Sequence, residues 1–181
     1  MFLIPEDYTA YIRASIKEDI LLGQTAVIQK VELAAQEEIS SYLAGRYDVT
    51  KIFVVIRDYT ATTQFNAGDY IYRSGSIYKA LEAIQGVDPA TEILESDPRV
   101  ALEDPRNPLI VQRMVYITLY HAHKALPGSQ IPQLRIDDYD ISLRWLEKVA
   151  SGLVNPLLPE AEVEGNSIVA YGSEERRTTR W

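Results

Sequence analysis

The sequence predicts a mainly α-helical protein: a bundle of about four helices that carries a small β-rich insertion and ends in an extended C-terminal tail. Three observations predict this class. Apolar residues recur every three or four positions in residues 26–47, 108–125 and 137–151. Residues 60–104 instead hold alternating tyrosines, β-branched residues and turn-forming pairs. Residues 160–181 show no periodicity, as expected of a tail.

These patterns divide the chain of 181 residues into four parts. Residues 1–59 form the first part of the helical core, residues 60–104 the insertion, residues 105–159 the second part of the core, and residues 160–181 the tail. The chain is long enough for one domain with a substantial core plus a small insertion.

The first part of the core should contain two helices. Pro5 suits the first turn of a short helix that runs through Ile16 and ends at Gly23. The longer helix of residues 26–47 begins after Thr25, a good N-cap residue. Its predicted buried face consists of Val27, Val31, Ala34, Ala35, Ile39, Tyr42 and Leu43. Charged and amide side chains, Glu37 and Glu38 among them, are expected on the solvated side.

The second part of the core supplies the partners of that helix. Residues 108–125 begin at Pro108, a favourable first helical residue, and carry a broad apolar surface. A third helix is expected over residues 137–151, with Gly152 as its C-terminal stop. The acidic residues Asp137, Asp138 and Asp140 would then lie in its first turn, where carboxylates favour the positive end of the helix dipole.

The remaining chain should be extended. Residues 52–56 are β-branched and aromatic, which is typical of a strand. Residues 70–72 and 77–83 flank the Ser74-Gly75 pair and predict a β-hairpin. Residues 99–102 could add a brief strand.

Composition excludes several classes of function. The net charge of -8 and the isoelectric point near 4.8 argue against broad, sequence-independent binding to DNA, which requires lysine and arginine against the phosphates. The absence of cysteine removes disulfides, thiolate metal sites and cysteine nucleophiles. No apolar run reaches the roughly 18 residues of a membrane span, so no membrane association is expected.

The sequence contains no recognisable catalytic motif. Patterns for phosphate-binding loops, dinucleotide folds, serine hydrolases and zinc proteases are all missing. His121 and His123 are two positions apart on a helix and face different directions, so they cannot chelate one metal ion. We therefore predict no catalytic, cofactor or metal site, and a protein that is not an enzyme.

Two groups of residues are candidate interaction sites. Tyr70, Tyr72 and Tyr78 of the insertion either form a flat aromatic surface for a sugar or a protein, or they form the core of the hairpin. The tail offers an arginine-rich arm with aromatic residues, which is either an exposed charged tail or a segment that docks on an acidic neighbouring subunit. Its candidate residues are Tyr171, Arg176, Arg177, Arg180 and Trp181.

The helical segments resemble a known family. The blocks VELAAQEEISSYLAGRYDV, NPLIVQRMVYITLYHAH and DYDISLRWLEKVASGLV are similar to the small head-tail connector proteins of phages and prophages, especially the Mu-like family. The first block contains the family-like run of residues 39–47 at the end of its helix, the second contains the Pro108-Leu109 pair, and the third contains residues 143–147 followed by a glycine. The insertion departs from shorter members, which have a loop there. It resembles small aromatic β-modules similar to carbohydrate-binding ones, but it lacks the usual tryptophan after Gly86.

The resemblance implies a structural adaptor of the virion, made in the host cytoplasm and placed at the head-tail junction. Such a subunit would form a ring with copies of itself, dock on the portal protein and bridge to the next neck or tail protein, partly through residues 170–181. DNA would pass through the acidic lumen without specific binding. Two alternatives stay open: a glycan- or protein-binding module carried on a helical scaffold, and an enzyme that acts on nucleic acid during packaging.

Overall fold

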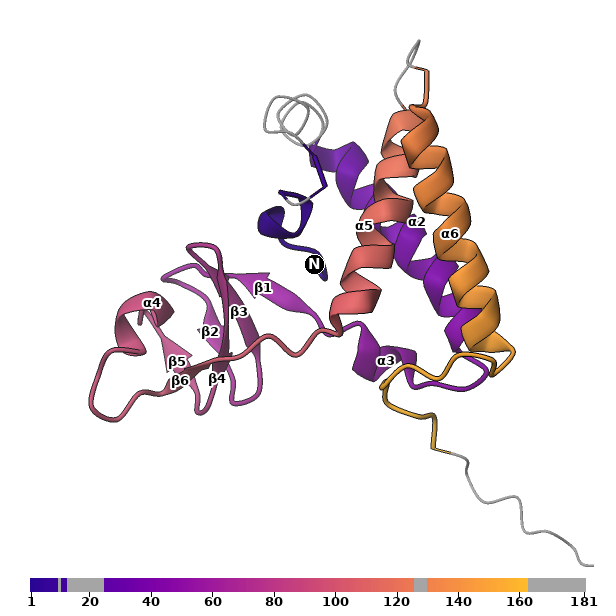
Figure 1. The fold of residues 1–181 in the computed structure, drawn as a ribbon. Coiled ribbons are helices and arrows are strands. Elements are labelled where there is room, and N and C mark those ends of the chain that lie inside the picture. The colour runs from indigo at the N-terminus through magenta and orange to yellow at the C-terminus, as the bar shows by residue number, and fades with distance from the viewer. Residues whose placement is uncertain (10, 13–24, 126–129, 163–181) are drawn as a thin grey trace, which may run out of the picture.

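The computed structural model describes residues 1–9, 11–12, 25–125 and 130–162. A column of helices stands beside a β-rich lobe (Figure 1). The described residues are 45% helical and 15% strand, and they form a four-stranded sheet and five α-helices. The prediction of a mainly α-helical bundle of about four helices is therefore wrong, and the fold has mixed α/β content. The reason is that the insertion builds a sheet with a core of its own.

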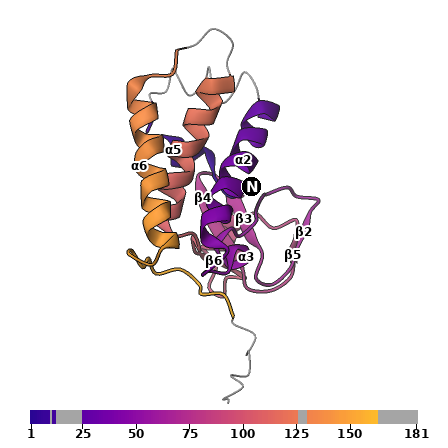
Figure 2. The same ribbon diagram turned by 90° about the vertical axis from the view of Figure 1, so that its right-hand side faces the viewer.

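Three long helices form the column: α2 (Thr25–Leu43), α5 (Pro108–Ala125) and α6 (Gln133–Ala150). Each of them contacts the other two (Figure 2). Their inward side chains are apolar and follow helical spacing, which is why the helices pack into one core. The members with no exposed surface are Ala35, Ile39, Leu43, Ile110, Val115, Ile117, Leu119, Leu146 and Val149.

Helix α6 begins four residues earlier than the sequence predicts. It starts at Gln133, directly after Pro132, so Asp137, Asp138 and Asp140 lie beyond the first turn. The expectation that these carboxylates lie in the first turn, at the positive end of the helix dipole, is therefore wrong. Two of the carboxylates have local partners instead: Asp137 accepts a hydrogen bond from the Gln133 amide, and Asp138 lies 3.4 Å from the Arg135 guanidinium.

The end of α2 is tied to the end of α6. Arg46 Nη1 donates a 2.8 Å hydrogen bond to the Val149 carbonyl in the last turn of α6. The Tyr47 hydroxyl donates to Asn155 Oδ1 at 2.7 Å. Gly152 has φ of +80°, and a Cβ there would lie 3.2 Å from Arg46 Nη1. A residue without a side chain is thus needed where the two helix ends meet.

Two N-terminal expectations are corrected. Residues 52–56 do not form one strand. Helix α3 (Val49–Ile52) ends at Ile52, and β1 (Ile56–Asp58) begins at Ile56. Asp48 is the N-cap of α3, and its carboxylate accepts hydrogen bonds from two backbone amides of the first turn. Before them, residues 5–8 form a 3-10 helix, η1 (Pro5–Tyr8), where the sequence predicts an α-helix. Most of that predicted helix lies outside the described residues.

The lobe is built on a four-stranded sheet in the order β1-β3-β4-β6. Strand β1 runs parallel to β3 (Tyr70–Arg73), while β4 (Ser76–Ala80) is antiparallel to both β3 and β6 (Val100–Leu102). The predicted hairpin is confirmed, with Ser74 and Gly75 at its turn and both at positive φ.

The lobe has its own apolar core. A second, two-stranded sheet of β2 (Gln64–Phe65) and β5 (Ile84–Gln85) and the short helix α4 (Pro89–Glu92) accompany the main sheet. The buried core residues are Phe65, Ile71, Tyr78, Ala80, Ile84 and Val100. A separate small cluster of Ile4, Ile56 and Ile77 joins the N-terminal segment to the main sheet.

A buried arginine joins the lobe, the N-terminal segment and the helices. Arg106 lies between β6 and α5, and its side chain is only 3% exposed. It donates hydrogen bonds to the Phe2 carbonyl, to Asp7 and to Asp104. Within the described part of the chain, no helix is both long and apolar enough to cross a bilayer.

Candidate functional site

A groove with a cationic lining lies between α5 and α6. Its volume is about 350 Å³, and it is lined by Arg113, Ile141, Arg144, Trp145, Lys148 and Val154. We call it the basic groove. Its lining holds three cations, an aromatic ring and two aliphatic side chains but no carboxylate, although the chain as a whole carries a net charge of -8.

The packing of the helices places these side chains. Leu146 and Val149 on α6 are fully buried, which orients the helix and leaves Trp145 half-buried at the edge of the contact with α5. Arg113 comes from α5, and its Cζ lies 5.5 Å from the centroid of the Trp145 ring. This distance is within the range of a cation-π interaction.

The three cations of the groove are not neutralised by carboxylates of the described residues. In the described ranges of the chain, Arg113, Arg144 and Lys148 form no ion pair with a carboxylate. Arg113 Nε is also shielded from solvent without a hydrogen-bond partner in those ranges. A buried donor without a partner is costly to the fold.

The apolar lining continues along α6. Ile141 is 51% exposed, and Leu134, seven positions earlier on the same face, is 62% exposed. Exposed apolar side chains beside unpaired cations suit a ligand that has both an apolar side chain and a carboxylate. The groove is therefore suited to binding an acidic protein segment.

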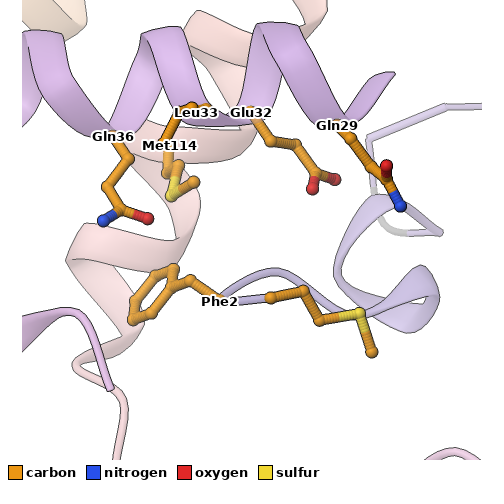
Figure 3. Close-up of a pocket in the computed structure, with 7 residues that line it drawn as sticks. Phe2, Gln29, Glu32, Leu33, Gln36 and Met114 are labelled. Atoms are coloured by element: carbon orange, nitrogen blue, oxygen red, sulfur yellow. The ribbon is translucent and has the colours of Figure 1, made fainter. Parts of the chain in front are cut away.

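A second pocket, of about 290 Å³, lies between the N-terminal segment and α2. Figure 3 shows the side chains of Gln29, Glu32 and Gln36 pointing from α2 toward the N-terminal segment that carries Phe2. Met114 of α5 also lines the pocket. The Tyr8 hydroxyl donates a 2.6 Å hydrogen bond to Glu32. Burial raises the pKa of the Glu32 carboxyl, and the hydrogen bond from Tyr8 only partly opposes this effect. Burial and the neighbouring Glu32 raise the pKa of Tyr8 well above 10.0.

Glu32 should make stability depend on pH. Because its folded-state pKa is raised, its contribution to stability is fully present below the ordinary value of 4.5 and is lost as the pH rises through the folded-state value. We expect Glu32→Gln to be more stable than the wild type at neutral pH, since glutamine can still accept from Tyr8. The difference should vanish below pH 4.5. Urea unfolding at both pH values measures it.

The matched control for that experiment is Glu37→Gln, because Glu37 lies on the exposed side of the same helix. A surface substitution of this kind should change stability by less than about 0.5 kcal/mol. Equal stability of Glu32→Gln and the wild type at neutral pH would show that the burial of this carboxyl has no energetic consequence.

The three tyrosines of the insertion do not share one surface. Tyr70 and Tyr72 lie on the same face of β3, while Tyr78 of β4 pairs with Ile71 and lies on the opposite face, 7% exposed in the core of the lobe. The hydroxyl of Tyr70 donates to Glu103 at 3.2 Å, and that of Tyr72 donates to Glu6 at 2.8 Å. Successive side chains of a strand point to opposite faces of the sheet, and paired residues of neighbouring strands share a face. Tyr78 therefore shares the face of Ile71 and not that of Tyr70 and Tyr72, so the three rings do not form one flat surface.

Glu38 lies in an aromatic cluster and not on the solvated face that the sequence suggests. His121 Nε2 is 2.9 Å from one carboxylate oxygen, and the Tyr139 hydroxyl donates to the other at 2.7 Å. Tyr120 stacks on Tyr139 with ring centroids 4.1 Å apart. Burial and the hydrogen bond to Glu38 raise the pKa of Tyr139. The cluster bridges α2, α5 and α6, so it serves their packing.

The other histidine, His123, also lies on α5, and burial together with the nearby Arg135 lowers its pKa. Over residues 1–9, 11–12, 25–125 and 130–162, no group of three or more potential ligands is placed to hold a metal ion. The candidate tail residues lie outside the described residues: Tyr171, Arg176, Arg177, Arg180 and Trp181.

Sequence reasoning missed the basic groove. The available signal was the pattern of α6, in which Leu134, Ile141 and Lys148 repeat every seven residues on the side away from Leu146. No sequence pattern indicated the position of Arg113. It is a single cation within an apolar helical segment, and only the packing of α5 on α6 shows that it lies against Trp145.

Comparison of the chain with protein-family models, with curated proteins and with solved structures gives no match.

Proposed function

We propose that the chain is a head-tail connector subunit of a phage virion. In this role it forms an oligomeric ring with copies of itself, docks on the portal protein and bridges to the next neck or tail protein. It acts as a structural adaptor without catalytic activity. Residues 170–181 contribute the arginine-bearing segment that contacts a neighbouring subunit.

One observation carries the proposal. The three sequence blocks that resemble connector proteins, residues 31–49, 107–123 and 138–154, are separated in sequence but fall on α2, α5 and α6. These helices pack on one another as one core. The blocks also interlock, since Arg46 of the first donates to the Val149 carbonyl of the third. A resemblance spread over three segments thus describes one connected unit.

The charge distribution supports the proposal as well. An acidic subunit repels phosphates, so a ring of such subunits would let DNA pass through its lumen without adhering. The exposed apolar side chains beside the cations of the basic groove suit a contact with another protein subunit.

Mass spectrometry of purified particles tests this function. Particles of the phage or prophage that encodes the chain should contain it at a copy number that matches a portal-associated ring, with the portal and major capsid proteins as internal standards. Its absence from mature particles would overturn the proposal.

A further inference from the structure

The far end of the lobe carries an exposed, acidic and apolar segment, here called the acidic tip and defined as residues 93–97. Leu94 is 83% exposed, and its neighbours Glu95 and Asp97 are also exposed. Ile93, in contrast, is half-buried against the core of the lobe and holds the segment in place. Leu94 is thus displayed on the surface, with two exposed carboxylates within three residues of it.

The carboxylates of the acidic tip are available for a partner. Within the parts of the chain that the structure describes, neither Glu95 nor Asp97 forms an ion pair, whereas nearby Glu92 is already paired with Arg99 at 2.6 Å. The tip therefore presents an apolar side chain flanked by unpaired negative charge. The basic groove presents the reverse: apolar side chains flanked by the unpaired cations Arg144 and Lys148.

The tip and the groove lie on opposite sides of the molecule. In Figure 1 the end of the lobe with α4 is at the far left and α6 is at the right. In Figure 2 the helices face the viewer and the lobe lies behind them. The complementary surfaces of one chain are thus placed to meet those of other chains.

We propose that the acidic tip of one copy docks in the basic groove of the next copy, with Leu94 against Trp145 and Ile141, and with Glu95 and Asp97 beside Arg144 and Lys148. Each copy then offers one tip and one groove, so the contact is heterologous and repeats from copy to copy, and it builds a ring where the rotation between successive copies closes. This interface rests on the proposed ring-forming function and names the surfaces that build the ring.

Two charge-reversed variants of the full chain test the contact. The groove variant carries Arg144→Glu with Lys148→Glu, and the tip variant carries Glu95→Lys with Asp97→Lys. Sedimentation velocity should show wild-type species larger than a dimer and each variant alone as a monomer. An equal mixture should again form species larger than a dimer, because the intact tip of the groove variant pairs with the intact groove of the tip variant, and the reversed tip pairs with the reversed groove.

Two further variants test the charge complementarity and the contribution of Leu94 separately. Combining all four reversals in one chain should restore the large species, since the charges are then exchanged and again complementary. Leu94→Ala should weaken assembly by about tenfold without changing charge, because the leucine side chain loses its burial.

Matched controls reverse the same number of charges elsewhere on exposed positions: Lys30→Glu with Lys124→Glu, and Glu37→Lys with Glu147→Lys. These should assemble like the wild type, and circular dichroism should show every variant folded. A wild type confined to monomers or dimers, single variants that assemble normally, or a mixture that stays monomeric would each overturn the interface. Particle mass spectrometry is independent of these results, so failure of the interface and failure of the connector function are distinguishable.

Discussion

Replacing Arg106 with methionine should lower the free energy of unfolding by about 3–5 kcal/mol, because the change leaves buried carboxylate and carbonyl groups without their partner. The Arg106 side chain is 3% exposed, and that of Asp7 is 10% exposed. Methionine fills part of the same space without supplying a donor. The loss should therefore reflect the electrostatics of the site more than its packing.

The geometry explains why the effect should be large. Arg106 Nη1 is 2.9 Å from the Phe2 carbonyl oxygen and 2.5 Å from Asp7 Oδ2, and Nη2 is 2.8 Å from Asp104 Oδ2. Burial acts to raise the pKa of the Asp104 carboxyl, but the hydrogen bonds from Arg106 outweigh it and lower the pKa. One guanidinium thus holds the N-terminal segment against the link between the lobe and α5.

Urea unfolding of Arg106→Met beside Arg57→Met measures the effect. Arg57 also pairs with an aspartate, Asp69, but its side chain is 41% exposed. An exposed pair contributes at most about 1 kcal/mol. If the two substitutions lowered the free energy of unfolding equally, the burial of Arg106 would not increase its contribution to stability.

Leu146→Ala should lower the free energy of unfolding by about 2–5 kcal/mol. Leu146 is fully buried where α6 meets the core, so the substitution removes apolar contacts and leaves a cavity. Because the lobe has a separate core, the destabilisation should be concentrated in the helices. Hydrogen exchange of α2, α5 and α6 should accelerate more than that of β3 and β4.

Leu134→Ala is the control for that prediction. Leu134 is on the same helix and is 62% exposed, so the same chemical change removes little buried surface. Its effect on stability should stay within about 0.5 kcal/mol. A Leu146→Ala variant as stable as Leu134→Ala would mean that α6 does not contribute to the core as described.

The sequence was informative where local rules decide the structure. The bounds of α5 follow from Pro108 at its start and from apolar periodicity, and the hairpin turn follows from Ser74-Gly75. Pairing between distant segments left no such signal, so the parallel alignment of β1 with β3 and the size of the sheet could not be predicted. Helix α6 was misplaced because Pro132 precedes its start, while the acidic residues that suggested an N-terminus lie further along.

The same distinction applies to the candidate site. The basic groove joins Arg113 of α5 to Arg144 and Lys148 of α6, and the spacing of one helix carries no information about the side chains of another. The burial of Tyr78 depended on register, since a shift of one residue would have placed it beside Tyr70 and Tyr72.

The position of the sheet within the chain also bears on the order of folding. The helices α2 and α5 must find each other across the whole lobe, which would be slow if the intervening chain were a flexible coil. Strands β1 and β6 are the two edges of the four-stranded sheet, three strand spacings or about 14 Å apart. A flexible segment of the length of residues 59–99 would separate its ends by about 35 Å. A lobe that folds first would therefore shorten the distance between the chain segments that lead to α2 and α5, and so favour the packing of these two helices.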